Sequence, residues 1–575
     1  MALSSSLNSL LILTRIINTD KPTQHTLKNH RPDKTEIFSQ AEPIRRLPRG
    51  CAEDVGLTTE YVQSYLNEIG NDPAVRANRI LVVKDGIVIG EQYRHPYTDD
   101  SWDCVYSATK TVTALALGAL WDEGKVDLDE PACRILGVEN KVGNARNKRI
   151  TLRHLLTMAT GNTFDEIESN ASVRWVKDYF DSPNKFKIGS KFDYNSLNTY
   201  IIGACLQKIA GVTLAEYVQE KFFTPMGINH TLFEQSPEGV TKSGWGLYIL
   251  PEDMAKLGML VLNGGVWEGQ RLVSEEWLQQ MTHKQIAATK VGHRFDYGYQ
   301  MWVDDDLDFC CFNGMYEQDV HIWRKSGVVT VLCCANNEAF HDAGIYTVGA
   351  KYFAEATMGR YDFVPVGLDR TLPDAPSFRY LLDDICDRDY VTKDKIANSC
   401  GLLPLLLQSV MSTYVKGIRG VRFTKGEHGR YTLWVDEHGV ETPLTFDFDR
   451  GVRDVYRFEG NVYEYVADAH FILDPQSDPI LVIRMFFLEY ASSRYIVLHY
   501  GKTIDKMRLE LNENPGSKFL ESFMDSLDAP TRKLLDNATK LLEKDFVPKT
   551  LRNMFNPSFA LTHKPAPVTD ETPRE

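Results

Sequence analysis

The sequence lacks the patterns that mark the common metal, nucleotide and hydrolase sites. Its ten cysteines form no C-x-x-C, so a structural zinc site has no support. No P-loop, H-E-x-x-H, G-x-G-x-x-G or G-x-S-x-G occurs. These motifs would indicate phosphate binding, zinc peptidase, dinucleotide or α/β-hydrolase chemistry. We therefore expect no metal and no cofactor.

A positive charge excess and a long apolar run are also missing. The chain has 64 Lys and Arg against 78 Asp and Glu, a formal net charge of -14. This balance argues against a nucleic-acid or anionic-membrane partner. No run approaches the roughly 18 apolar residues of a spanning helix. The apolar residues 10–13 are too few for a secretory signal and no basic residue precedes them.

Cysteine is sparse, and part of it occurs as two adjacent pairs, Cys310–Cys311 and Cys333–Cys334. Neighbours in a strand point to opposite faces, so these side chains are predicted to be small buried hydrophobes. A chain of 575 residues does not need disulfides for stability. We expect reduced thiols and a cytoplasmic location.

The length of 575 residues exceeds what one core accommodates and predicts two domains. A Pro-containing stretch with little periodicity separates them. The predicted layout is an N-terminal extension over 1–45, a first domain over 46–362, a linker over 363–377, a β-rich domain with flanking helices over 378–550, and a flexible tail over 551–575.

The first domain is predicted to be of the α/β (α+β) class. An Asp85-Gly86 turn between apolar runs predicts a hairpin over 80–89. Later strands are expected over 299–303, 320–323 and 328–332, so the sheet combines both ends of the domain. Between them, helices are predicted over 107–120, 151–160, after Asn195, and over 253–262.

The C-terminal domain carries short alternating stretches separated by Asp-, Gly- and Asn-rich turns. This pattern predicts antiparallel strands in a small barrel or curved sheet. The expected strands are 430–435, 442–448, 462–465, 480–487, 494–500 and 507–511, with helices over 402–415 and 522–545.

The chemistry centres on an S-x-x-K sequence, Ser107 to Lys110. On a helix these side chains share a face. A serine hydroxyl needs a base, and a buried lysine can serve because desolvation lowers its pKa. If Ser107 opens the helix, its N–H is also free to bind an oxyanion. The alternative is a capping serine beside a solvated lysine.

A second S-x-x-K, Ser182 to Lys185, is a control within the same chain. Pro183 and polar neighbours predict a surface loop in which Ser182 is at most a cap. By contrast, an apolar helix follows Ser107, which favours a central position for the first copy.

The residues around these positions resemble the class C β-lactamase-related serine hydrolases. The likeness rests on 106–110 with 121–129, on 150–158, and on ordered motifs at 192–196, 244–247, 252–258 and 297–302. It covers about residues 50–360, and it is strongest to the branch of 6-aminohexanoate-dimer hydrolases and carboxylesterases. The resemblance implies a β-lactamase/transpeptidase-like antiparallel sheet flanked by helices, with a helical subdomain.

The resemblance also implies roles. Tyr194 shares proton transfer with Lys110, which requires nearby positive charge to lower the pKa of its phenol; the alternative is a core tyrosine. Phe312, Asn313 and Gly314 form the third motif, on an edge strand. The N–H groups of Ser107 and Met315 form the oxyanion hole.

Several positions depart from the pattern of β-lactamases and cell-wall peptidases. Ser196 replaces Asn in the tyrosine motif, and Phe312 replaces the Lys or His that holds a substrate carboxylate. An apolar residue cannot pair a carboxylate. Glu317-Gln318 is similar to a Gly-Gln of the esterase-like branch, with Glu317 in place of the glycine. Ser196, Phe312, Asn313 and Gly314 are the candidate substrate-binding residues, whereas His95, His154 and His321 are expected to be structural.

The sequence thus predicts a serine hydrolase that cleaves a small-molecule ester or amide. A β-lactamase or D-Ala-D-Ala-type peptidase is the alternative within this class. A non-catalytic binding or regulatory protein on the same scaffold is the alternative from another class. The oligomeric state is left open.

Overall fold

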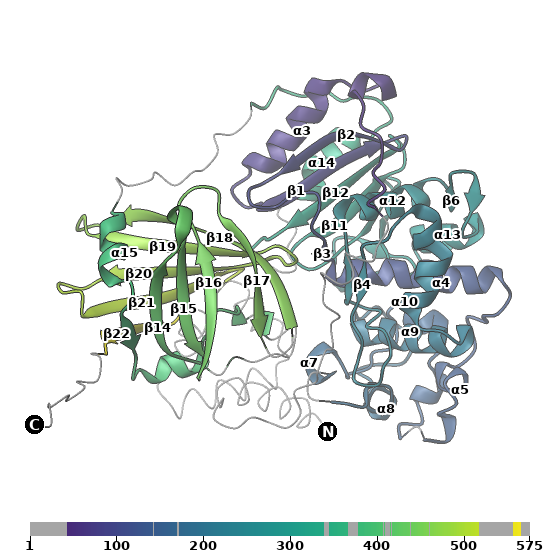
Figure 1. The fold of residues 1–575 in the computed structure, drawn as a ribbon. Coiled ribbons are helices and arrows are strands. Elements are labelled where there is room, and N and C mark those ends of the chain that lie inside the picture. Colours follow the sequence, from purple (N-terminus) through teal and green to yellow (C-terminus); the bar gives the residue numbers. More distant parts are fainter. Residues whose placement is uncertain are drawn as a thin grey trace, which may run out of the picture. The chain divides into compact units, whose positions relative to one another are not determined.

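The computed structural model describes residues 43–141, 143–169, 172–337, 344–365, 378–405, 407–408, 415, 417–437, 439–458, 461–516 and 556–564. Most of the predicted extension and linker, and the helix expected over 522–545, lie outside these ranges. The described residues fall into two compact units (Figure 1). Unit 1 holds those before residue 369 and Leu488–Ala491, and unit 2 holds the others.

Unit 1 is built on a seven-stranded antiparallel sheet in the order β2-β1-β12-β11-β10-β9-β8. The predicted hairpin turns at Asp85 and Gly86, both with positive φ. Since β1 pairs with β12, the two ends of the unit's sequence meet inside one sheet, as predicted. The strands are β1 (Ala77–Lys84), β2 (Ile87–Tyr93), β8 (Asp296–Tyr297), β9 (Trp302–Asp304), β10 (Phe309–Phe312), β11 (Gln318–Trp323) and β12 (Val328–Cys334).

Helices cover both faces of this sheet (Figure 1). Cys310 and Cys333 pack on the side of α4 (Thr109–Asp122) and α12 (Pro251–Leu262). Their neighbours Cys311 and Cys334 pack on the opposite side, with α3 (Thr59–Asn71) and α14 (Ile345–Phe353). The expectation that adjacent cysteines serve two separate cores is therefore confirmed, and all ten cysteines are free thiols.

Two capped helices form the centre of the helical subdomain. Thr151 caps α6 (Leu152–Leu156), and Asn195 caps α9 (Ser196–Ala210) with its side chain on the N–H of Leu197. The helix expected over 151–160 ends at Leu156. Its last carbonyls are taken by the side-chain amide of Gln300, 2.9 Å from Leu156 O, which ends the helix without loss of hydrogen bonding.

The remaining elements of unit 1 are short. The helices are α5 (Ala132–Ile135), α7 (Glu166–Ser169), α8 (Trp175–Asp181), α10 (Leu214–Val218), α11 (Thr224–Met226) and α13 (Glu275–Thr282), and the strands are β3 (Asp103–Cys104), β4 (Leu232–Phe233), β5 (Leu247–Ile249), β6 (Val266–Trp267) and β7 (Gln270–Arg271). Across the described residues, no single helix has the length and apolarity to cross a bilayer. The bent pair Ser196–Ala210 and Leu214–Met226 meets that criterion only when taken together.

Unit 2 is a ten-stranded antiparallel sheet in the order β16-β15-β14-β13-β22-β21-β20-β19-β18-β17. A bridge joins Asp447, just after the end strand β16, to Asp468 on β18, the neighbour of the other end strand β17, so the sheet curls into a near-barrel, as predicted. Its elements are α15 (Arg379–Ile385), β13 (Asp389–Val391), β14 (Ile418–Lys425), β15 (Tyr431–Glu437), β16 (Val440–Phe446), β17 (Val452–Phe458), β18 (Asn461–Leu473), β19 (Pro479–Phe487), β20 (Ser492–Tyr500), β21 (Lys506–Asn514) and β22 (Ser558–His563).

Unit 2 differs from the prediction in two places. Strands β13, β14 and β17 were not expected, and β22 lies inside the stretch predicted to be a flexible tail, where it pairs with β13 and β21. The predicted helix over 402–415 lies partly outside the described residues. Its first residues are held by a buried ion pair, since Arg494 donates to the carbonyls of Gly401 and Leu403 while it bonds Glu513.

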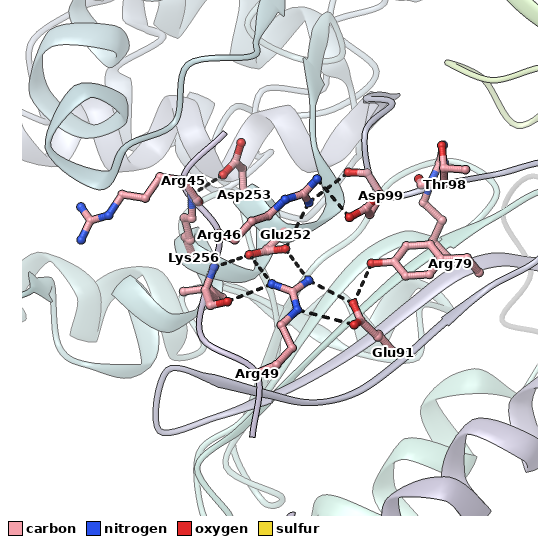
Figure 2. Close-up of polar contacts among 12 residues, drawn as sticks. Arg45, Arg46, Arg49, Arg79, Glu91, Thr98, Asp99, Glu252, Asp253 and Lys256 are labelled. Atoms are coloured by element: carbon pink, nitrogen blue, oxygen red, sulfur yellow. Dashed lines mark hydrogen bonds and ion pairs between the residues drawn. The ribbon is translucent and has the colours of Figure 1, made fainter. Parts of the chain in front are cut away.

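An ionic network fastens residues 45–49 to α12 in unit 1 (Figure 2). The Glu252 carboxylate accepts from Nη1 and Nη2 of Arg49 at 2.9 and 2.8 Å, and from the N–H of Leu47. Lys256, one helical turn later, donates to the carbonyl of Arg45, the first residue of the segment. Burial alone would raise the pKa of Glu252, but the bonds from Arg49 and Leu47 outweigh burial and lower it.

Glu252→Gln should therefore lower the free energy of unfolding of unit 1 by roughly 2 kcal/mol, because buried donors lose a charged acceptor. Denaturant unfolding at neutral pH tests this. Since the folded pKa of Glu252 is depressed, the difference from wild type should be complete above its usual value of 4.5 and shrink as the pH falls below it. Glu91→Gln is the matched control, since Glu91 bonds the same guanidinium from a more exposed position. Equal losses from both variants would contradict the assignment.

Candidate active site

Ser107 and Lys110 lie together where a short 3₁₀ turn (Tyr106–Ala108) leads into α4. Ser107 is therefore in the turn before the α-helix, rather than its first residue. Lys110 Nζ is 2.8 Å from Ser107 Oγ. Tyr106 holds a positive φ of 42°, which costs a non-glycine residue energy and turns the chain sharply just before the serine.

The Lys110 amine is removed from solvent. The residue is 1% exposed, and Nζ contacts Ser196 Oγ at 2.8 Å and the carbonyl of Gly244 at 2.6 Å. Burial lowers the pKa of Lys110 to about 7, with Glu166 acting weakly in the other direction. A Cβ at position 244 would lie 2.8 Å from the carbonyl of Ser196, so the glycine lets the two segments meet around the amine.

The partners of the amine fix its orientation. The Gly244 carbonyl can only accept, so it takes one N–H of Lys110. In the neutral amine the second N–H can serve Ser196, which leaves the lone pair for the Ser107 hydroxyl. The arrangement therefore permits the hydroxyl of Ser107 to donate its proton to Lys110.

Tyr194 lies beside this pair. Lys110 Nζ is 4.9 Å from the centre of its ring, and Trp302 stacks on that ring at 5.8 Å with an angle of 10°. Burial raises the pKa of Tyr194, and a hydrogen bond with Ser107 offsets only part of that. The expectation that positive charge lowers this pKa is therefore wrong. Burial dominates, and an amine with a pKa of about 7 has lost its charge well below the pH at which a phenol ionises.

The second S-x-x-K behaves as a surface feature, as predicted. Ser182 ends α8, and its hydroxyl donates to the carbonyl of Asp178. Lys185 pairs with Asp193 at 3.0 Å, and its side chain is 53% exposed. The same four-residue pattern thus gives a buried pair at one place and two separate surface residues at another.

The third motif follows strand β10. This strand lies between β11 and β9, so it is not the edge strand expected; its pairing with β9 nevertheless ends at Cys311. Gly314 is packed so tightly that a Cβ would lie 2.4 Å from the carbonyl of Val105, two residues before the serine. Only glycine permits this approach.

Phe312 does not face the candidate site. It is buried in the core on the side of α4 and α12. A side chain that points into this core does not contact a substrate, so the expectation that Phe312 disfavours substrates with a carboxylate is wrong. Ser196 is also buried, and its hydroxyl is bonded to Lys110.

A cavity of about 310 Å³ opens beside the serine. Aromatic and acidic side chains, among them Tyr194, Trp302 and Asp319, form part of its wall. The cavity is also lined by Ser107, Asn313, Gly314, Met315 and His321. Within the described part of the chain, neither the N–H of Ser107 nor that of Met315 donates a hydrogen bond. The predicted residues Ser107, Tyr194, Asn313, Gly314 and Met315 therefore share one cavity.

Sequence reasoning missed several residues of this wall. Trp302 was part of a recognised motif without an assigned role, whereas Asp319 carried no signal. His321, expected to be structural, lines the cavity with Nε2 on Asp319 at 3.4 Å. No cluster of three or more side chains suited to a metal ion occurs among the residues that the structure describes.

Comparison with known proteins places this geometry in a family context. Residues 65–348 match the family model described as Beta-lactamase. Protein flp of Staphylococcus aureus (strain COL) is 24% identical over 173 residues, which are 27% of this chain and 34% of the relative. The chain thus spans about a third of the length of the first curated relatives it matches.

Two further comparisons are more distant in identity but longer. The 6-aminohexanoate-dimer hydrolase of Paenarthrobacter ureafaciens is 21% identical over 283 residues, 43% of this chain and 67% of the relative. A solved penicillin-binding protein homologue from Caulobacter crescentus is 15% identical, with a TM-score of 0.43, and covers 50% of this chain and 94% of its own.

The burial of Lys110 has a measurable effect on stability. Its pKa is about 7 when folded and about 10.5 when exposed, so between these values the unfolded chain binds more protons and stability rises with pH. The unfolding free energy of wild type should gain roughly 1.4 kcal/mol per pH unit over that of Lys110→Met across this window. Denaturant titrations from pH 7 to 10 measure the difference. A difference that does not vary with pH would show that the amine stays charged in the folded chain.

Proposed function

We propose that this protein, whose residues 65–348 match the Beta-lactamase family model, is a serine hydrolase that cleaves an ester or amide through an acyl-enzyme on Ser107. The observation that carries this proposal is the buried amine of Lys110, 2.8 Å from Ser107 Oγ. A base with a pKa of about 7 is suited to general base catalysis at neutral pH.

In the acylation step, the Ser107 hydroxyl transfers its proton to the neutral Lys110 amine as Oγ attacks the substrate carbonyl. The carbonyl oxygen becomes an oxyanion, which the unpaired N–H groups of Ser107 and Met315 are available to bind. The bond to the leaving group then breaks, and the acyl group stays on Oγ.

Tyr194 acts as a proton donor rather than as a base in this scheme. Its raised pKa keeps the phenol protonated at neutral pH, so it can protonate the departing alcohol or amine while Lys110 holds the serine proton. The Lys110 proton then replaces the one lost by the phenol. In deacylation, a water molecule gives one proton to the neutral Lys110 amine as its oxygen attacks the acyl carbonyl. The bond to Ser107 Oγ then breaks, Lys110 returns the proton to Oγ, and the acid leaves.

The cavity wall indicates a substrate preference. Tyr194, Trp302 and the residues Phe295 and Tyr346 offer an aromatic surface for the acyl group. Glu317 also lines the cavity, close in sequence to Met315, and places acidic character near the third motif. We therefore favour an uncharged or cationic acyl group over one that carries a carboxylate.

A β-lactamase or D-Ala-D-Ala-type peptidase is the second candidate. One observation favours it, since Arg294 also lines the cavity and could pair a substrate carboxylate. Arg294 is already bonded to Thr347 at 3.0 Å and lies over the Tyr346 ring. The third candidate is a non-catalytic binding protein. Such a protein would not require a buried amine next to a serine.

The nucleophile is tested by covalent labelling with a fluorophosphonate probe. Wild type should be labelled and Ser107→Ala should not, because the probe bonds to an activated serine oxygen. Ser182→Ala is the matched control, since it removes the serine of the solvent-facing S-x-x-K, and it should be labelled like wild type.

Unchanged labelling of Ser107→Ala would refute the assignment, and absence of labelling in wild type would support the non-catalytic alternative. Turnover of a chromogenic cephalosporin at a rate comparable to that of short acyl esters would support the β-lactamase alternative.

The roles of Lys110 and Tyr194 are separated by pH. For ester hydrolysis, kcat/KM should rise with pH through about 7, where Lys110 loses its proton. Tyr194→Phe should lower kcat about 10²- to 10⁴-fold, a typical range for loss of a proton donor, yet keep the same inflection. A wild-type inflection near 10 that disappears in Tyr194→Phe would show that the phenolate is the base instead.

A further inference from the structure

We propose that Asp319 is a positioning residue that holds the oxyanion-hole segment in place, an inference that rests on the proposed function. Asp319 lies on β11, is buried, and lines the same cavity as Ser107. Its carboxylate binds the two residues that precede Met315, whose N–H is the second donor assigned to the oxyanion.

The contacts of Asp319 fix both a side chain and the backbone of the third motif. Asn313 Nδ2 donates to Oδ1 and Oδ2 at 3.0 and 3.2 Å, and the N–H of Gly314 donates to Oδ1 at 3.1 Å. Bonds to a charged acceptor are stronger than neutral ones. The peptide between Asn313 and Gly314, which directly precedes the peptide that carries the Met315 N–H, is therefore held by a buried carboxylate.

The segment needs such an anchor because its own conformation is unfavourable. Tyr316 and Glu317, which follow Met315 directly, both have φ of 63°. Left-handed backbone costs a non-glycine residue about 1–2 kcal/mol. The turn is closed by the N–H of Glu317 on the carbonyl of Gly314 at 3.1 Å. Without Asp319, the start of this strained turn loses its hydrogen bonds to β11.

The same contacts argue against Asp319 as a group that binds substrate directly. Both of its oxygens already accept hydrogen bonds from Asn313, and Oδ2 also faces His321 Nε2 at 3.4 Å. A carboxylate so occupied sets geometry, and its loss should affect the transition state more than substrate binding.

The test compares hydrolysis of an ester with that of the corresponding thionoester by wild type, Asp319→Ala and Asp319→Asn. The sulfur of a thionoester is a weak hydrogen-bond acceptor, so its reaction depends little on the oxyanion donors. For Asp319→Ala we expect kcat for the ester to fall about 10- to 100-fold with KM nearly unchanged, and the ester-to-thionoester ratio to fall by a similar factor.

Asp319→Asn should lose less, because its side-chain oxygen can still accept from Gly314. Asp306→Asn, in an exposed turn of the same sheet, is the control and should match wild type. If Asp319→Ala does not fold, Asn313→Ala replaces it in the test. This variant removes an exposed side chain that bonds the Asp319 carboxylate. It should shift the ester-to-thionoester ratio in the same direction.

Three results would overturn the proposal: unchanged kcat in Asp319→Ala, equal losses for both substrates, or a rise in KM at constant kcat. Each leaves the proposed hydrolase intact, because wild type still turns over the ester. A wild type that neither hydrolyses esters nor reacts with the fluorophosphonate probe defeats the proposed function itself.

Discussion

The structure of the candidate site depends on keeping one amine out of water. An ammonium group transferred from water to a protein interior loses hydration that nearby carbonyls and hydroxyls only partly replace. Lys110 meets this condition because α4 is buried along nearly its whole length. Burial lowers the pKa of Lys110 to about 7, so a substantial fraction of the amine is neutral at neutral pH, and the neutral form is the one that can accept the proton of Ser107.

This constraint explains features far from the serine. The apolar α4 must lie inside the subdomain, so α9 and α12 and one face of the sheet surround it. Glu252 on α12 anchors residues 45–49 through Arg49, so a partly buried ionic network fastens this segment to a helix of the apolar interior. Packing and ion pairs across unit 1 thus offset the unfavourable free energy of burying the amine.

Whether a feature of the fold or the site could be predicted depends on how far apart in the sequence its interacting residues lie. The pair Ser107–Lys110 and the caps Thr151 and Asn195 are local, and the sequence was sufficient for them. The face to which Phe312 points depends on the register of β10, because successive side chains of a strand point to opposite faces. Asp319 and the raised pKa of Tyr194 depend on contacts and burial across segments distant in sequence, which no local pattern encodes.

Glu317 brings an acidic side chain to the cavity wall at a position whose backbone conformation favours glycine. The resemblance places glycine here, and the φ of 63° explains why, since glycine adopts it without strain. Glutamate costs about 1–2 kcal/mol in this conformation, but glycine would cost about 0.5–1 kcal/mol more in unfolded-chain entropy. The entropy cost of glycine thus offsets only about half of the strain of glutamate. A carboxylate therefore lines the cavity beside the turn that carries Met315, where we propose that it disfavours anionic acyl groups.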